Sequence, residues 1–192
     1  MRITDLLDKR SISLDAAPAD KKATLDMAVE LMAKSGKLMD VEQYRAQVYA
    51  REEESTTGIG EGIAIPHGKC DAVKTPGLAA MVIKNGVDYD SLDGEPVTLL
   101  FLIAAPNTKD NVHLDVLSKL SVMLMDENFT TSLRNAKSVE EFLQIIDAAD
   151  ESAKSIDDRL SDTGITTEEK KSFKLLAVTS CPTGIAHTYM AV

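Results

Sequence analysis

Apolar residues recur every three or four positions, the spacing of an amphipathic helix, in four segments of the chain. In the first, residues 17–36, Pro18 fits the first turn and Gly36 can close the end. In the second, Asp40 is a favourable N-cap and Arg51 falls near the C-terminal end. The pattern therefore predicts a pair of consecutive helices in the first third of the chain.

The third and fourth predicted helices cover residues 110–128 and 138–150. His113 lies in the first turns of the third helix. At the start of the fourth, Ser138 and Glu141 match a capping box, in which each side chain accepts a hydrogen bond from the other residue's backbone N–H. Both helices follow the segments that are predicted to be strands.

Short apolar runs at residues 63–66, 78–84 and 97–106 are typical of strands. The run at 97–106, "VTLLFLIAAP", is apolar almost throughout, as expected for a strand that is covered on both faces of its sheet. Strands that alternate with helices indicate an α/β fold. We expect one domain with a central mixed β-sheet and helices on both faces, followed by a flexible tail.

The composition of the chain changes after residue 150. Residues 151–172 are rich in Ser, Thr, Asp and Lys with few apolar positions, which predicts a flexible linker. Residues 173–192 begin with a strand-like run, "FKLLAVTS", but are too few to bury a core of their own. We therefore expect a domain over residues 1–150, a linker, and the truncated start of a second domain.

The charge of the chain is strongly negative, −10 over 192 residues, and residues 1–150 hold 16 Lys and Arg against 25 Asp and Glu, or −9. A negative surface repels the phosphates of nucleic acid and attracts a basic partner, so we expect no nucleic-acid partner. The sequence shows neither a membrane-spanning apolar run nor a secretory signal at its start. We expect a cytoplasmic protein.

The most unusual segment is "TGIGEGIAIPHGK", which sets His67, one of only three histidines, between a proline and a glycine. The glycines allow sharp turns and a close approach of a ligand to the backbone, so we expect His67 to be presented rather than buried. The alternative is a surface histidine without a role. Nicotinamide binding is disfavoured because the third glycine of that fingerprint is misplaced.

A zinc site and a hydrolase are two alternatives for the same residues. His67, Cys70 and His113 could in principle bind zinc, but their spacing lacks the close pairs of a metal site, and we expect no metal and no cofactor. A hydrolase built on His67 would need a nucleophile or metal ligands that the sequence does not offer. Arg51 precedes three glutamates, and an arginine at a helix end is most often a solvated charge.

The segment "REEESTTGIGEGIAIPHGK" resembles the active-site segment of the enzyme IIA domains of the fructose and mannitol group in the bacterial phosphoenolpyruvate-dependent sugar phosphotransferase system. "NVHLDVLSKL" is similar to the family's second histidine segment. The resemblance covers residues 1 to about 150. It implies that His67 is the phosphorylated residue, with Arg51 and His113 as its active-site partners.

"VTSCPTGIAHTYMA" separately resembles the phosphorylated-cysteine loop of fructose-type enzyme IIB, with Cys181 at the cysteine position. The resemblance implies that His67 receives a phosphoryl group from the histidine-containing phosphocarrier protein and passes it to this cysteine. A membrane enzyme IIC would take part in the full-length transporter, at the cytoplasmic face of the inner membrane. The alternative is a regulatory relative that acts by phosphorylation-dependent protein binding, and the motifs leave the sugar open.

Elementary chemistry agrees with these roles. A neutral imidazole is a nucleophile at neutral pH, and phosphohistidine retains enough transfer potential to hand its phosphoryl group on. Phosphoryl transfer requires in-line positioning and donors around the equatorial oxygens, which the guanidinium of Arg51 can supply as a planar fork. His113, near the positive end of its helix, is expected to be a neutral donor.

Overall fold

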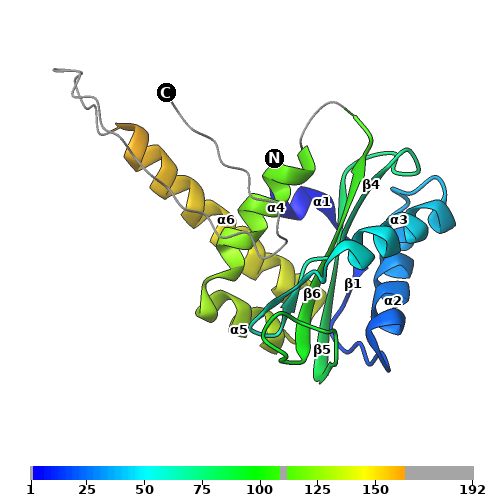
Figure 1. The fold of residues 1–192 in the computed structure, drawn as a ribbon. Helices are drawn as coiled ribbons and strands as arrows, with labels where there is room; N and C mark the ends of the chain where they lie inside the picture. The colour runs from blue at the N-terminus through cyan, green and yellow to red at the C-terminus, as the bar shows by residue number, and fades with distance from the viewer. Residues whose placement is uncertain (1, 109–111, 163–192) are drawn as a thin grey trace, which may run out of the picture.

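The computed structural model describes residues 2–108 and 112–162 and shows a mixed β-sheet between two layers of helices (Figure 1). The strands lie in the order β1-β5-β6-β3-β2. Strand β4 also pairs with β6, further along that strand than β3 does. Their bounds are β1 Leu7–Ser13, β2 Gly58–Gly60, β3 Ile63–Ala64, β4 His67–Cys70, β5 Gly77–Val87 and β6 Val97–Pro106. The predicted α/β class with helices on both faces is confirmed.

Strands β5 and β6 form the antiparallel centre of the sheet, while β1 joins β5, and β3 and β4 join β6, in parallel. Successive side chains of a strand point to opposite faces. In β6, Phe101 and Ile103 enter one core, whereas Leu100 and Leu102 enter the other. Burial on both faces explains why the sequence of this strand is almost continuously apolar.

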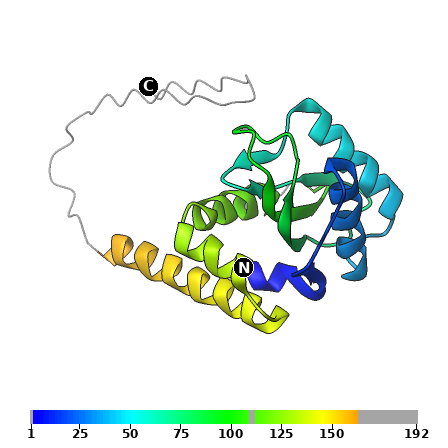
Figure 2. The same ribbon diagram turned by 90° about the horizontal axis from the view of Figure 1, so that it is seen from below.

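One face of the sheet is covered by α2 (Lys21–Lys34) and α3 (Val41–Glu54), and the other by α1 (Ile3–Leu6), α4 (Val112–Leu124), α5 (Glu127–Asn135) and the start of α6 (Val139–Asp162) (Figures 1 and 2). Asp40 caps α3 as predicted, by accepting a hydrogen bond from the Gln43 N–H at 3.0 Å. The start predicted for α2 is wrong, because Asp20 caps that helix and Pro18 lies before it.

The N-terminal elements were not predicted from the sequence. Strand β1 reads "LDKRSIS", and its charged residues 8–10 interrupt the alternation of apolar and polar positions. The register of β1 against β5 shifts between Leu7 and Ile12, so the two apolar anchors of the strand are separated by an irregularity. A strand with such a shift in register does not show the period of two on which the prediction depends.

The last helix is longer than predicted. The predicted end at residue 150 is wrong, since α6 continues to Asp162 through the first half of the expected linker. Ser138 accepts from the Glu141 N–H at 3.1 Å, as in a capping box, but the Glu141 carboxylate turns to the Lys137 N–H at 2.8 Å. The rest of the linker, residues 173–192 and Cys181 lie outside the described residues.

Candidate functional site

His67 is the first residue of β4 and pairs with Ile103 of β6. The strand predicted over residues 63–66 would place His67 just past its end. The structure shows instead that β3 ends at Ala64 and that a new short strand begins at His67, and between them lie Ile65 and Pro66, which has no N–H to donate to a sheet. The side chain is half-buried. The histidine is therefore held by the sheet yet open to one side, which agrees with the expectation that it is presented.

Both ring nitrogens of His67 have a polar partner. Nδ1 lies 3.0 Å from the carbonyl oxygen of Ile65, and Nε2 accepts a hydrogen bond from Nε–H of Arg51 at 3.1 Å. A carbonyl can only accept, so Nδ1 carries the proton and Nε2 carries the lone pair. The backbone thus fixes a neutral tautomer whose nucleophilic nitrogen faces the guanidinium.

Arg51 lies in the last turn of α3, near the end of that helix as predicted. Its Nη1 donates to the carbonyl oxygen of Ser55 at 3.0 Å and to the Ser55 hydroxyl at 3.3 Å, while Nε donates to His67. The guanidinium is planar, so bonds from two of its nitrogens fix the orientation of the whole group. Ser55, which the sequence analysis did not single out, is therefore part of the site.

A cavity of about 180 Å³ opens over His67 and Arg51. Its rim carries two exposed apolar side chains, Ile59 and Leu92, which lie beside the polar groups. Helix α4 closes one side with Leu117 and Ser121. The remaining lining residues are Ser55, Thr56, Thr57 and Ile65.

A tight turn precedes the histidine segment. Gly60, Glu61 and Gly62 all have positive φ, at 103°, 55° and 72°, a conformation that glycine adopts readily and other residues rarely. Arg134 of α5 donates to the carbonyl oxygen of Glu61 at 2.7 Å. The glycines that pointed to a functional loop therefore build the turn that leads into β3 and on to His67.

Gly68 sets the distance between β4 and α3. A Cβ at this position would lie 2.9 Å from Cε2 of Tyr44 and 3.1 Å from Cγ2 of Val48, and Tyr44 is fully buried with its hydroxyl bonded to the Ile103 carbonyl at 2.9 Å. Only a residue without a side chain allows this approach. The close contact brings the end of α3, and with it Arg51, next to His67.

We predict that Gly68→Ala destabilises the fold and loosens the site. Overpacking of this kind costs about 1–3 kcal/mol, since Tyr44 cannot move away without losing its hydrogen bond. Urea unfolding measures the loss, and the 15N spectrum of the His67 ring reports its contact with Arg51. An unchanged unfolding midpoint would contradict the close packing.

The other sequence candidates are placed as follows. His113 lies in the first turn of α4, as predicted, and only its backbone is described. Cys70 is buried on the face of β4 that packs against α3, whereas alternation directs His67 to the other face.

In residues 2–108 and 112–162, no group of three or more His, Cys, Asp or Glu side chains could hold a metal ion. Within the same residues, no helix is long and apolar enough to span a membrane.

The sequence analysis missed a buried carboxylate beside the site, Glu52, whose side chain is 6% exposed. Burial by itself would raise the pKa of Glu52, but hydrogen bonds from Thr57 and Lys21 outweigh burial and hold the pKa below its ordinary value. In the sequence, Glu52 is the first of three consecutive glutamates, which resemble a solvated charge run. Nothing in that run distinguishes the one glutamate that folds inward.

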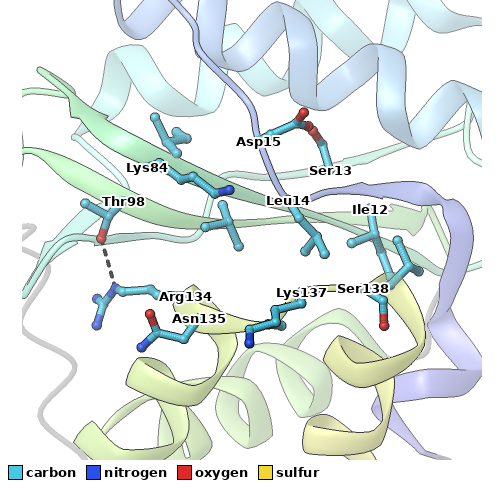
Figure 3. A pocket seen from close by; sticks show the side chains of 14 residues that line it. Ile12, Ser13, Leu14, Asp15, Lys84, Thr98, Arg134, Asn135, Lys137 and Ser138 are labelled. Carbon is cyan, nitrogen blue, oxygen red and sulfur yellow. Dashed lines mark hydrogen bonds between the residues drawn. The ribbon is translucent and has the colours of Figure 1, made fainter.

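A larger cavity of about 880 Å³ lies toward the other end of β5 and β6, where Lys84, Arg134 and Lys137 surround it (Figure 3). Arg134 there donates to the Thr98 hydroxyl at 2.9 Å in addition to Glu61, so its guanidinium is engaged in structural bonds. Among the residues that the structure describes, no histidine or cysteine lines this cavity. The smaller cavity over His67, which holds a nucleophile and a cation together, is therefore the candidate site.

Comparison with known proteins identifies the family to which residues 5–149 belong. Residues 5–149 match the family model described as "Phosphoenolpyruvate-dependent sugar phosphotransferase system, EIIA 2". The chain is 44% identical over 191 residues to the "PTS system fructose-specific EIIABC component" of Bacillus subtilis (strain 168), an alignment that covers 100% of this chain and 30% of that relative. The chain thus spans less than a third of the length of that relative.

Two solved structures share the fold. "Nitrogen Regulatory Protein IIA-Ntr from Neisseria meningitidis" aligns with a TM-score of 0.70 at 32% identity, over 75% of this chain and 98% of that one. The "complex of enzyme IIAMTL and phosphorylated enzyme IIBMTL from Escherichia coli" aligns with a TM-score of 0.65 at 28% identity, over 74% and 99%. Because the family model spans nearly all of the predicted first domain, this chain belongs to the EIIA 2 family of the phosphoenolpyruvate-dependent sugar phosphotransferase system, and its domain is a phosphotransferase component.

Proposed function

We propose that Nε2 of His67 accepts a phosphoryl group and passes it on, so that the domain carries phosphoryl groups for the uptake of a fructose-type sugar. The observation that carries the proposal is the pair of hydrogen bonds on His67: the Ile65 carbonyl accepts from Nδ1–H, and Nε2 faces Arg51 with its lone pair. The cavity over this nitrogen gives a donor access. The name of the Bacillus subtilis relative supports fructose as the sugar class.

The chemical step exchanges one P–N bond for another. The Nε2 lone pair attacks the phosphorus of the donor phosphohistidine in line, the new P–N bond forms, and the donor ring nitrogen leaves with the electron pair of the old bond. Nδ1–H of His67 stays hydrogen-bonded to the Ile65 carbonyl oxygen, and this hydrogen bond stabilises the positive charge that develops on the ring. No proton has to be transferred to or from His67 during the exchange.

Arg51 is proposed to move from Nε2 to the phosphoryl oxygens as they arrive, since its bonds to Ser55 keep the fork next to the reacting atom. His113 is proposed as a second donor. Positions 113, 117 and 121 share one face of α4, because residues four apart lie one above the other in a helix. Leu117 and Ser121 line the cavity, which supports a place for position 113 at the same opening.

The proposed partners are two proteins and a membrane domain. The histidine-containing phosphocarrier protein is the proposed donor, and its basic face would be attracted by a domain of charge −9, counted as 16 Lys and Arg against 25 Asp and Glu. The acceptor is proposed to be the cysteine of an enzyme IIB domain, Cys181 in the motif at the end of this chain, with enzyme IIC as the membrane component. The Escherichia coli complex of IIA with phosphorylated IIB supports this order.

A second candidate function is regulatory. The Neisseria meningitidis structure is named a nitrogen regulatory protein, and its fold and 32% identity suit a protein that is phosphorylated in the same way but acts by binding. The segment "CPTGIAHTYMA" in this chain favours the carrier, since a regulator has no use for an acceptor cysteine. Transfer of the phosphoryl group from this chain to an isolated enzyme IIB domain distinguishes the two, because a pure regulator would retain it.

The proposal is tested by labelling the chain with phosphoenolpyruvate, enzyme I and the phosphocarrier protein. We expect one added phosphoryl group on His67 that is lost in acid and survives in base, as a P–N bond does. Initial labelling rates should fall as salt rises, because salt screens the attraction between the acidic domain and its basic donor. Peptide mapping that placed the phosphoryl group on His113 would overturn the assignment.

A further inference from the structure

The inference concerns the buried carboxylate of Glu52 and rests on the proposed function. Its two oxygens accept hydrogen bonds from four groups: Oε1 from the Thr57 N–H at 2.9 Å and from Lys21 Nζ at 2.9 Å, Oε2 from the Thr57 hydroxyl at 2.5 Å and from the Tyr89 hydroxyl at 3.3 Å. Glu52 follows Arg51 directly in α3. Carboxylates are rarely buried unless they are paired, and they gather at functional sites, so a buried carboxylate next to Arg51 indicates a role in the site.

Thr57, which Glu52 holds, is connected by hydrogen bonds and short chain segments to both Arg51 and His67. Glu52 fixes Thr57, and the chain between them carries Ser55, whose carbonyl and hydroxyl hold Nη1 of Arg51. The Thr57 carbonyl in turn accepts from the Ile65 N–H at 3.0 Å, and the Ile65 carbonyl holds Nδ1 of His67. Thr57 is therefore connected to Arg51 through Ser55 and to His67 through Ile65.

We propose that Glu52 is a positioning residue that holds Arg51 and His67 in register for phosphoryl transfer. The two side chains come from different elements, α3 and β4, which the chain joins through residues 55–66, a segment that holds β2, the turn at residues 60–62 and β3. A shift of about 1 Å between reacting groups can cost a factor of 10² in rate. The Glu52 carboxylate restricts such a shift, because its hydrogen bonds with Thr57 fix the end of α3 against the segment before β4.

The other groups around Glu52 make it specific for a carboxylate. Lys21 comes from α2 and lies 4.9 Å from the ring centre of Tyr89, so its charge is placed over the cluster from the neighbouring helix. An amide at position 52 would present an N–H₂ group where two donors now meet one oxygen. It must then lose the bond to Thr57 N–H or rearrange the hydroxyls of Thr57 and Tyr89.

Glu52→Gln in the full chain of 192 residues tests the proposal. We expect the maximal rate of His67 labelling to fall about 10-fold to 100-fold, with the KM for the phosphorylated carrier protein within twofold of wild type, since Glu52 is buried and does not face a partner. The 15N spectrum of the His67 ring should show loss of the single Nδ1–H tautomer, which labelling does not measure.

Asp26→Asn is the matched control. Asp26 also joins α2 to α3, by accepting from Arg45 and from the Tyr49 hydroxyl at 2.8 Å, but none of its bonds leads to Ser55, Thr57 or Ile65. It should label at the wild-type rate with an unchanged ring spectrum. The proposal fails if the labelling rate and the His67 ring spectrum of Glu52→Gln match those of wild type, or if both variants slow equally. Absence of labelling in the wild type would reject the proposed function instead, while the ring spectra still test the positioning.

Discussion

Replacing His67 by alanine is expected to abolish phosphoryl labelling while leaving the fold intact. Among the described residues that line the cavity, the His67 imidazole supplies the one side-chain nitrogen with an available lone pair, so its loss removes the group that forms the P–N bond. The side chain is half-buried and its hydrogen bonds go to Arg51 and a backbone carbonyl, so its loss removes little core packing. Intact-mass measurement after incubation with phosphoenolpyruvate, enzyme I and the phosphocarrier protein checks the result.

The control for this experiment is a fold measurement on the same sample. Thermal unfolding of His67→Ala should stay close to wild type, since surface-side substitutions usually change stability by about 0.5 kcal/mol or less. His67→Gln keeps a polar side chain but no ring nitrogen, and it should also fail to label. A His67→Ala protein that labels at the normal rate would place the acceptor elsewhere.

Arg51→Ala should slow labelling by about 10²-fold or more without preventing it, because removal of one electrostatic donor to a transition state costs that much. Arg51→Lys should recover only part of the rate. A lysine keeps the charge, but its single ammonium cannot bond His67 and Ser55 together as the planar fork does. Single-turnover kinetics at a saturating concentration of the phosphorylated donor separate this effect from weaker binding.

Arg45→Ala is the matched control for Arg51. Both arginines lie on α3, but Arg45 bonds Asp26 and Glu42 and is not among the described residues that line the cavity over His67. The two variants remove the same charge from the acidic domain, so any general loss of electrostatic attraction is common to both. A labelling rate that fell equally in both would show that Arg51 contributes only charge.

The local pattern of the sequence predicted most of the helices and the two central strands, because buried elements repeat with the period of their geometry. It failed where the geometry is irregular. Strand β1 contains a register shift, and α6 continues to Asp162 through residues whose polar composition predicts a linker. The sequence predicts that His67 follows a strand, whereas the structure has two short strands, β3 and β4, which Pro66 separates and which both pair with β6.

The sequence by itself determined the chemistry of the candidate site: the scarce histidine between Pro66 and Gly68, the glycines before it, and the arginine at a helix end. These signals are local, since they depend on residue type and on neighbours in the chain. Only the tertiary structure decided which charges matter. It brought Arg51 to 3.1 Å from His67, turned Glu52 inward while a glutamate beside it stays exposed, and oriented the ring through the Ile65 carbonyl. Contacts between α3, β4 and the turn before β3 depend on how buried surfaces pack across the sheet, and no period along the chain encodes them.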